Sequence, residues 1–323
     1  MTGLRVLLLK LSSLGDVIHQ LPALTDLHAL RPEVVVDWAV EEAYASLVGL
    51  HPSVTRAIPV ALRRLRAQPG SSGAWKSLGA SLALLRRGRY DRVIDTQGLL
   101  KSAILARFAR GPRYGYDRSS IREPAASLLL DVRVSVSREQ HAVDRIRALF
   151  AGVFGYVPSG PADYGLGGAS LAKPDWTPPA PYVVALHATS RHDKRWADTE
   201  WVRLADRLEA AGLSVVYPWG NASEREVAER LVAQSGAAVL APRVSLIEAA
   251  GLLRHAAAVV GVDTGLAHLA AALGTPTVGI YVATKPGLTG LTGGGTLANL
   301  GAPGAPPTSA AVMEALRPAL ERT

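Results

Sequence analysis

A carboxylate, Asp16, follows the apolar run LRVLLLKL near the start of the chain, within the stretch Ser12–Leu24, SSLGDVIHQLPAL. Ser12, Ser13 and Gly15 precede it and apolar residues at helical spacing follow it, so we predict a loop between a strand and a helix. A carboxylate in such a loop can take a proton from a hydroxyl group as a general base. The structural alternative is that Asp16 only stabilises the positive end of the helix dipole.

A second set of polar residues, Asp263, Thr264, Gly265 and His268, lies in the stretch Val259–Tyr281, VVGVDTGLAHLAAALGTPTVGIY. The backbone N–H groups at the start of the predicted helix, together with its dipole, form an anion site suited to a diphosphate. Gly265 permits close approach of a ligand, while Asp263 and His268 can hydrogen-bond sugar hydroxyls or phosphate. The alternative is an ordinary strand–turn–helix with a capping Asp and a His at the edge of the core.

Two further predicted strand ends carry groups that suit the same ligand. The stretch His187–Trp196, HATSRHDKRW, offers Thr189, Ser190 and Lys194 for phosphate oxygens, and PWGNASERE offers Glu224 for a ribose. Lysine is a compact point charge suited to phosphate. A solvated loop and a simple helix cap are the alternatives for these two stretches.

The first half of the chain contains candidate groups for an anionic ligand: Arg63, Arg64, Gln97, Lys101 and Arg122. Arginine side chains bind carboxylates and phosphates through two parallel hydrogen bonds. For any single arginine, the alternative is a solvated surface charge.

The net charge of +8 is concentrated in this half. Residues 1–157 contain 22 Lys and Arg against 13 Asp and Glu, a balance of +9, whereas residues 158–323 contain 13 against 14, a balance of −1. This asymmetry favours an anionic partner for the first half: nucleic acid, a membrane surface or a phosphorylated substrate. An Arg-rich composition without functional meaning is the alternative. An RNA-binding protein is not favoured, because aromatic residues do not interleave the basic ones and no RNP-like motif occurs.

The sequence lacks the residues and motifs of several other classes of protein, which excludes some of these classes and disfavours others. With no cysteine, disulfides, zinc–thiolate sites and thiol catalysis are excluded. No Walker loop or GxGxxG follows the first strand, and no HExxH, DxD pair or GxSxG occurs. No run of eighteen apolar residues suggests a membrane span, and the N-terminus lacks a signal-peptide cleavage site, so we expect a soluble, cytoplasmic protein.

Apolar runs alternate with helix-like stretches, which indicates an α/β fold with parallel sheets covered on both faces. The predicted strands are Arg5–Leu9, Val34–Val40, Ala57–Val60, Arg92–Asp95, Tyr182–His187, Leu213–Pro218, Ala257–Asp263 and Thr277–Val282. The predicted helices are Asp16–Ala29, Leu99–Ala109, Gln140–Phe154, Thr199–Ala211, Glu224–Gln234, Ser245–Arg254, Leu266–Leu273 and Ser309–Glu321.

A stretch rich in proline and glycine, residues 158–181, divides the chain and is predicted to be a linker. Two Rossmann-like, doubly wound domains, residues 1–157 and 182–308, are expected to face a cleft. Ligands of such domains bind at the carboxyl ends of the strands. We expect the final helix, in residues 309–323, to pack back on the first domain.

In these motifs the chain resembles the lipopolysaccharide heptosyltransferase I family of glycosyltransferase family 9, from its first strand to its last helix. The resemblance is carried, in this order, by LLLKLSSLGDVIHQLPALTDL, VDWAVEE, DTQGLLKSA, REPAASL, HATSRHDKRW, PWG and VDTGLAHLAAAL. It implies a two-domain GT-B fold and transfer of a heptose from ADP-heptose to the first Kdo of Kdo2-lipid A, with inversion and without a metal or other cofactor. It also implies a peripheral location at the cytoplasmic face of the inner membrane.

The resemblance also implies roles for the matching residues, with Asp16 as the general base. The implied donor site comprises Thr189, Ser190, Lys194, Glu224, Val244, Asp263, Thr264, Gly265 and His268. The implied acceptor site comprises Ser12, Ser13, Gly15, Arg63, Arg64, Gln97, Lys101 and Arg122. One departure is Lys285, which stands where the family pattern has an acidic residue, and His19 is open between supporting the Asp16 loop and packing.

Two other functions fit part of the same motifs. One is the related transferase that adds the second heptose, although the opening SSLGDVIHQLPAL favours the first. The other is a nucleotide-sugar-binding module without catalysis, which would not need Asp16 as a base.

Overall fold

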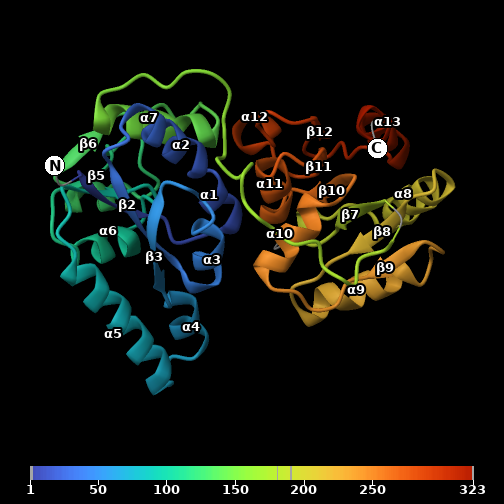
Figure 1. Cartoon of the computed structure of the whole chain (residues 1–323), viewed down its shortest axis with the longest axis horizontal. Coiled ribbons are helices and arrows are strands. Elements are labelled where there is room, and N and C mark those ends of the chain that lie inside the picture. Colours follow the sequence, from blue (N-terminus) through green and yellow to red (C-terminus); the bar gives the residue numbers. More distant parts are fainter. Residues whose placement is uncertain (1–2, 180, 190, 322–323) are drawn as a thin grey trace. The chain divides into compact units, whose positions relative to one another are not determined.

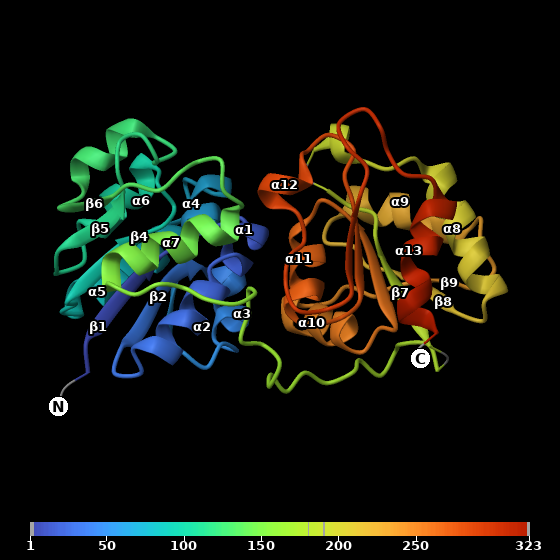
Figure 2. The ribbon, with the colours of Figure 1, turned by 90° about the horizontal axis from the view of Figure 1, so that it is seen from above.

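The computed structural model describes residues 3–179, 181–189 and 191–321 and divides into two compact units, Met1–Gly165 and Leu166–Thr323. Each unit is a parallel β-sheet covered by helices (Figures 1 and 2). The boundary falls within the predicted linker, residues 158–181, whose described part contains no helix or strand. The prediction of an α/β fold with two Rossmann-like units is confirmed.

The sheet of the first unit contains six strands in the order β3-β2-β1-β4-β5-β6, and all neighbouring strands are parallel. They are β1 (Arg5–Leu9), β2 (Val35–Glu41), β3 (Val54–Val60), β4 (Arg92–Asp95), β5 (Arg113–Tyr116) and β6 (Val132–Val134). The chain winds outward from β1 to β3, then returns to place β4 on the other side of β1. The carboxyl ends of β1 and β4 therefore form a topological switch point, where ligands of such folds bind.

Helices cover both faces of this sheet (Figure 1). They are α1 (Leu14–Ile18), α2 (Leu21–Leu30), α3 (Ala45–Val48), α4 (Leu62–Ala67), α5 (Ser72–Arg87), α6 (Leu100–Ala106) and α7 (Ala142–Phe154), with the 3₁₀ turns η1 (Glu42–Tyr44) and η2 (Pro124–Leu129). On one face, Leu7 and Leu9 of β1 pack with Leu85 of α5 and Leu105 of α6.

The single helix predicted over Asp16–Ala29 is in fact two helices, α1 and α2. Pro22 lies in the first turn of α2, where its missing N–H is tolerated. The same residue inside one long helix would remove a backbone hydrogen bond and clash with the preceding turn. The break leaves α1 as a separate short helix that carries Asp16.

The second unit repeats the winding of the first, with the order β12-β11-β10-β7-β8-β9. Its strands are β7 (Tyr182–Leu186), β8 (Ser214–Tyr217), β9 (Ala238–Leu240), β10 (Ala258–Val262), β11 (Thr277–Ile280) and β12 (Leu297–Leu300). Its helices are α8 (Asp198–Ala210), α9 (Ala222–Val232), α10 (Leu246–Arg254), α11 (Gly265–Ala272), α12 (Pro286–Thr289) and α13 (Ser309–Leu320), with the 3₁₀ turn η3 (His192–Lys194). The switch point here lies between β7 and β10.

The last helix, α13, packs within the second unit, against α8, β10 and β11 (Figure 2). Val312 and Leu316 are buried in the core that this unit's sheet shares with α8. Burying two such side chains stabilises the packing by about 3–6 kcal/mol. The apolar face of this helix completes the core of the second unit, and the expectation that the helix packs on the first domain stays a prediction.

Candidate active site

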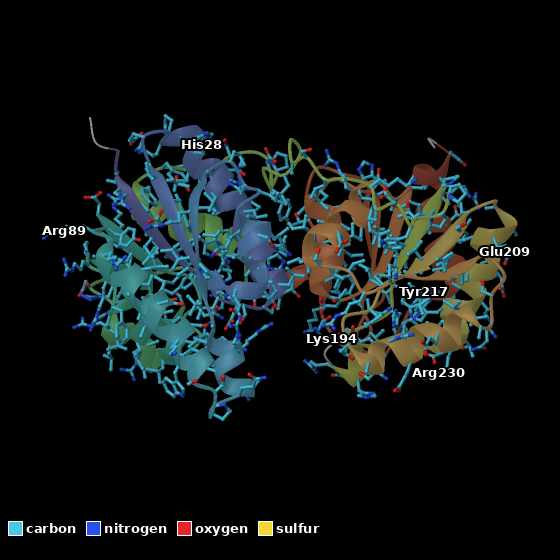
Figure 3. All side chains as sticks on the ribbon, turned by 60° about the horizontal axis from the view of Figure 1, so that its bottom comes forward. His28, Arg89, Lys194, Glu209, Tyr217 and Arg230 are labelled. Carbon is cyan, nitrogen blue, oxygen red and sulfur yellow. The ribbon has the colours of Figure 1, made fainter. Side chains whose placement is uncertain are left out.

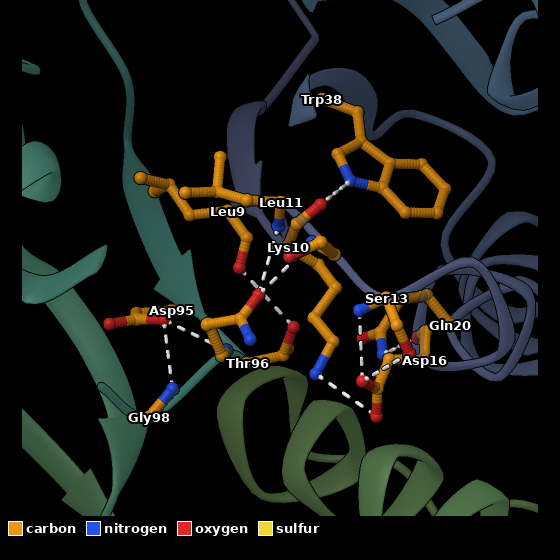
Figure 4. A network of polar contacts seen from close by, with 12 residues as sticks. Leu9, Lys10, Leu11, Ser13, Asp16, Gln20, Trp38, Asp95, Thr96 and Gly98 are labelled. Carbon is orange, nitrogen blue, oxygen red and sulfur yellow. Dashed lines mark hydrogen bonds and ion pairs between the residues drawn. The ribbon is translucent and has the colours of Figure 1, made fainter. Parts of the chain in front are cut away.

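Asp16 lies in α1, directly after the switch point of the first unit (Figure 4). Its Oδ2 accepts hydrogen bonds from the backbone N–H and the hydroxyl of Ser13, both at 3.0 Å. Its Oδ1 lies 3.6 Å from Nζ of Lys10, and 41% of the Asp16 side chain is exposed. Burial tends to raise the pKa of Asp16, but Lys10 and the Ser13 bonds outweigh it and hold this pKa below its ordinary value. Asp16 is thus an accessible carboxylate that is ionised at neutral pH.

Lys10, the residue after β1, is the group that sequence reasoning missed at this site. It is buried, and burial lowers the pKa of its ammonium against the opposing attraction of Asp16 and Asp95. Only one sign of it was visible in the sequence, a single charge near the end of an apolar run.

Gln97, predicted as a ligand for the acceptor, is used inside the protein. Its buried Oε1 accepts hydrogen bonds from the backbone N–H groups of Leu11 at 3.0 Å and Ser12 at 3.3 Å. The loop after β4 thereby holds the loop after β1. Gln97 therefore supports the Asp16 loop, and its contact with the acceptor stays a prediction.

A fully buried carboxylate, Asp95, organises the loop after β4. It accepts hydrogen bonds from the backbone N–H groups of Gln97 and Gly98, at 2.9 and 3.2 Å, and from the Ser102 hydroxyl at 2.9 Å. Burial raises the pKa of Asp95 to about 6, although these hydrogen bonds and Lys10 favour the charged form. Asp95 thus fixes the conformation of the loop after β4 at the switch point.

Arg122 and Lys101 lie around the same loops, and both side chains are exposed. The backbone N–H of Glu123 donates to Gly98 at 3.0 Å, which joins the segment containing Arg122 to the loop after β4. Gly98 has φ of 66°, and a Cβ on it would lie 3.0 Å from the Ile121 side chain. Arg122 also helps to lower the pKa of Lys10, so its charge acts on the Asp16 site.

Arg63 and Arg64, in α4, have different partners. The Arg63 guanidinium donates to the Tyr44 hydroxyl at 2.7 Å, and its backbone N–H donates to Glu41 at 3.1 Å. Arg64 forms a two-bond ion pair with Glu42 at 2.8 and 2.7 Å. An anionic ligand would compete with a carboxylate for Arg64 but only with a phenol for Arg63.

At the switch point of the second unit, Nζ of Lys194 donates to Oδ2 of Asp263 at 2.7 Å. The Thr284 hydroxyl donates to the same oxygen at 2.8 Å, and Nε2 of His268 lies 3.8 Å from Oδ1. Burial would raise the pKa of Asp263, but His268, Lys194 and Thr284 hold it well below its ordinary range. The structure therefore brings three of the predicted donor residues together, and Figure 3 labels Lys194 on its loop in the second unit.

The start of α11 adds backbone groups to this cluster. Thr264 is the N-cap residue, Gly265 is the first helical residue, and His268 is buried one turn into the helix. The unpaired N–H groups of a first helical turn bind anions, and the dipole adds to this attraction. The site thus combines an ammonium with helix N–H groups.

Glu224 and Thr189 line a small pocket at the ends of β7 and β8, together with His187, Trp196 and Trp201. The Glu224 carboxylate accepts from the Gly220 backbone N–H at 2.7 Å and from the Asn221 amide at 2.8 Å. These bonds close a cap at the start of α9, so a ribose would have to share this carboxylate. Ser190, also predicted for the donor, lies outside the described residues.

Three remaining positions are placed by the structure. Val244 is half-buried after β9, next to Arg243, which lines an open pocket of about 520 Å³ with Trp176 and Trp219. Lys285 is exposed at the N-cap of α12. The buried His19 ring packs edge-to-face on His141, with ring centroids 6.0 Å apart.

The described residues lack both a metal-binding cluster and a membrane-spanning helix. They contain no group of three His, Asp or Glu that could hold a metal ion. Nor do they contain a helix long and apolar enough to cross a membrane.

The model of glycosyltransferase family 9 (heptosyltransferase) matches residues 80–304. The chain belongs to this family. It is therefore a glycosyltransferase, which disfavours the alternative of a binding module without catalysis. It is 48% identical over 295 residues to lipopolysaccharide heptosyltransferase 1 of Pseudomonas aeruginosa, covering 90% of this chain and 82% of the relative. Identity to lipopolysaccharide heptosyltransferase 2 of Escherichia coli K12 is 26% over 310 residues, covering 88% of this chain and 85% of that one.

The similarity extends to solved structures of this glycosyltransferase family. The structure of E. coli heptosyltransferase WaaC with ADP superposes with a TM-score of 0.88 at 39% identity, covering 98% of this chain and 100% of that one. The WaaC structure with ADP-2-deoxy-2-fluoro heptose gives a TM-score of 0.86, also at 39% identity, covering 98% and 99% of the two chains. The predicted GT-B fold is confirmed by this likeness.

Proposed function

We propose that this glycosyltransferase moves L-glycero-D-manno-heptose from ADP-heptose to the first Kdo of Kdo2-lipid A, inverting the anomeric centre. Asp16 acts as the general base. The observation that carries the proposal is that Asp16 is an ionised, accessible carboxylate at a switch point, held by Lys10 and Ser13. Such a group can take the proton from an attacking hydroxyl.

The chain and its two substrates supply a group for each step of this reaction. The Kdo hydroxyl gives its proton to Asp16 while its oxygen forms a bond to the anomeric carbon of the heptose. The bond from that carbon to the ADP oxygen breaks, and its electron pair leaves with the diphosphate. Lys194 and the N–H groups at the start of α11 offset the charge that develops on the diphosphate.

In this reaction, the two parts of the chain bind different substrates. Residues 1–157 bind the acceptor, with Arg63, Lys101 and Arg122 facing its phosphates and carboxylates. Residues 182–308 bind ADP-heptose. The acceptor is a lipid, so the enzyme works as a peripheral protein at the cytoplasmic face of the inner membrane.

Comparison with relatives supports the first-heptose reaction over the second. Identity to the P. aeruginosa type 1 enzyme is 48%, against 26% to the E. coli type 2 enzyme. A transfer assay with ADP-heptose should therefore modify Kdo2-lipid A and leave an already heptosylated acceptor unchanged. Modification of only the heptosylated acceptor would contradict the proposal.

The base is tested by Asp16→Ala and Asp16→Asn. Turnover of each variant should fall by roughly 10²–10⁴-fold, the range that a positioned base contributes, with ADP-heptose binding nearly intact. Glu33→Ala, which removes an exposed carboxylate at the other end of the sheet, is the matched control and should keep full activity. Unchanged turnover in Asp16→Asn would refute the assignment of the base.

A further inference from the structure

The helices on one face of the first sheet carry basic residues and no acidic one. Helix α4 contributes Arg63, Arg64 and Arg66, and α5 contributes Lys76, Arg86 and Arg87. Helix α6 adds Lys101 and likewise contains no Asp or Glu. The acid-free segment runs from residue 43 to residue 90. These helices hold seven of the 22 Lys and Arg in residues 1–157 and none of the 13 Asp and Glu, so most of the net charge of this half lies on one layer of helices, which we call the α4–α6 layer.

The α4–α6 layer is one continuous surface. The Arg64 guanidinium donates to the Ser77 hydroxyl at 3.3 Å, which joins α4 to α5. The Arg86 guanidinium lies 5.2 Å from the ring centroid of Phe108, which follows α6. In Figure 1, α5 is the long helix at the outside of the first unit, with α4 beside its start. Figure 3 labels the exposed Arg89, directly after α5, at the border of this unit.

Large apolar side chains are exposed on the same layer. Trp75 of α5 is 56% exposed, and Leu100 and Ile104 of α6 are 42% and 53% exposed. The indole N–H of Trp75 donates to the Pro69 carbonyl at 2.9 Å, so the ring is held with its polar group satisfied. Tryptophan and neighbouring cations are the residues that bind membrane interfaces.

Two helices of the second unit, α8 and α9, carry more acidic than basic residues. Helix α8 contains four acidic residues, Asp198, Glu200, Asp206 and Glu209, against two arginines. Helix α9 contains three glutamates. An anionic surface would attract the α4–α6 layer and repel these two helices, so charge alone selects which face can bind.

We propose that the outer face of the α4–α6 layer docks this enzyme onto a bilayer that contains anionic phospholipid, with Trp75 at the level of the headgroups. The inference rests on the proposed function and deepens it, because a lipid-borne acceptor has to be met at a bilayer. Each basic residue close to an anionic surface strengthens binding by about fivefold. Several of them with one anchored indole suffice for reversible binding without a membrane-spanning helix.

The test is cosedimentation with sucrose-loaded vesicles in the absence of donor and acceptor. Wild-type protein should bind vesicles of phosphatidylcholine with 30% phosphatidylglycerol and release them as salt rises, and it should bind phosphatidylcholine alone weakly. The double variant Lys76→Glu/Arg87→Glu should lower the partition coefficient by at least about 30-fold. Trp75→Ala should lower it too, and should remove a blue shift of tryptophan emission on binding.

A matched control changes the net charge by the same amount on the second unit. Arg207→Glu/Arg230→Glu alters two exposed arginines, on α8 and α9, and should leave vesicle binding within about twofold of wild type. Equal losses in the two double variants would overturn the proposal, as would equal wild-type binding to neutral vesicles. So would binding to RNA but not to vesicles.

Transfer assays with two forms of the acceptor distinguish a failure of the docking proposal from a failure of the proposed function. Lys76→Glu/Arg87→Glu should keep wild-type transfer to a water-soluble, deacylated acceptor and lose transfer to acceptor presented in vesicles. Loss with the soluble acceptor would mean that the residues serve chemistry or folding, which overturns the docking role. The milder Lys76→Gln/Arg87→Gln should show an intermediate loss of vesicle binding. If wild type transferred to neither acceptor, the proposed function would fail, while the vesicle result would still decide the docking surface.

Discussion

Lys194 and Asp263 meet at 2.7 Å although they follow different strands, β7 and β10, on the two sides of the switch point in the second unit. The first unit has a similar pair, because Nζ of Lys10 lies 3.6 Å from Asp16 at its own switch point. In each unit a largely buried lysine therefore faces an aspartate where the ligand of such a fold binds. In the proposed reaction, Asp16 beside Lys10 takes the proton, and Lys194 beside Asp263 offsets the charge on the departing diphosphate.

The Lys194–Asp263 pair should matter for both stability and donor binding. Lys194→Met removes the ammonium from a largely buried carboxylate and leaves it with Thr284 and His268, so unfolding in urea at pH 7 should cost roughly 1–3 kcal/mol less than for wild type. The pKa of folded Asp263 is depressed, so its contribution to stability is complete above the unfolded pKa of about 4 and is lost as pH falls further. The difference between the proteins should shrink at pH 3, and ADP binding at pH 7 should weaken by at least about tenfold.

Lys173→Met is the control for this prediction, since Lys173 is an exposed lysine of the same unit. It should change neither ADP affinity nor the pH dependence of stability. A difference between Lys194→Met and wild type that grew on acidification would contradict the direction of the Asp263 pKa shift.

Replacing Lys10 should change how the rate depends on pH. Lys10→Met removes the ammonium that opposes the effect of burial on Asp16, so the pKa of Asp16 should rise. The acid limb of kcat/KM, measured with a soluble acceptor, should then move to higher pH. Lys76→Met, at an exposed position on α5, should leave the profile unchanged. An unmoved acid limb in a folded Lys10→Met protein would show that Lys10 does not tune the base.

Asp95 should make the protein less stable as pH rises. Its folded pKa is raised to about 6, so between about pH 4 and 6 the folded state holds a proton that the unfolded chain has lost. Stability from this group therefore falls over that window, by roughly 2–3 kcal/mol. Relative to Asp95→Asn, wild type should be less stable at pH 7 than at pH 4, as measured by urea unfolding at both values. A constant difference would argue against the shift.

Glu224 should serve both the helix cap and the donor. Glu224→Ala should lower the free energy of unfolding by about 1 kcal/mol, because the Gly220 backbone N–H and the Asn221 amide at the start of α9 lose their acceptor. It should also weaken ADP binding if this carboxylate binds the ribose. Glu224→Gln keeps a residue that can close the cap, so it should retain stability and lose less affinity. Calorimetric titration and thermal unfolding of both variants separate the two roles.

The central strands could be predicted from the sequence because strands buried on both faces are continuous apolar runs. Strands β1 and β4 have the predicted bounds. The short strands β5, β6, β9 and β12 were missed. Strands β6, β9 and β12 contain no fully buried residue and therefore give no such run, and only the last two residues of β5 are buried. Helix α5 was missed for a related reason, since glycine, serine and alanine dilute its apolar stripe.

The sequence allowed prediction of those site residues that directly follow strands, because the ends of parallel strands lie together at one edge of the sheet. Asp263, Lys194 and His268 come together for that reason. The partners of Gln97 could not be predicted, because a side-chain amide has no preference in sequence for the backbone of a distant loop. The contact of Thr284 with Asp263 likewise depends on the fold of a loop that the pattern does not specify.

The packing of α13 on α8, β10 and β11 makes residues 166–323 an uninterrupted module. The chain passes between the units once, through the stretch after α7, and the final helix stays with the sheet that it follows. One recombination event in that stretch could therefore exchange a complete half of the chain, its sheet and its helices together, for another. Under the proposed function, in which the second half binds the donor, such an exchange would change the donor and leave the acceptor site intact.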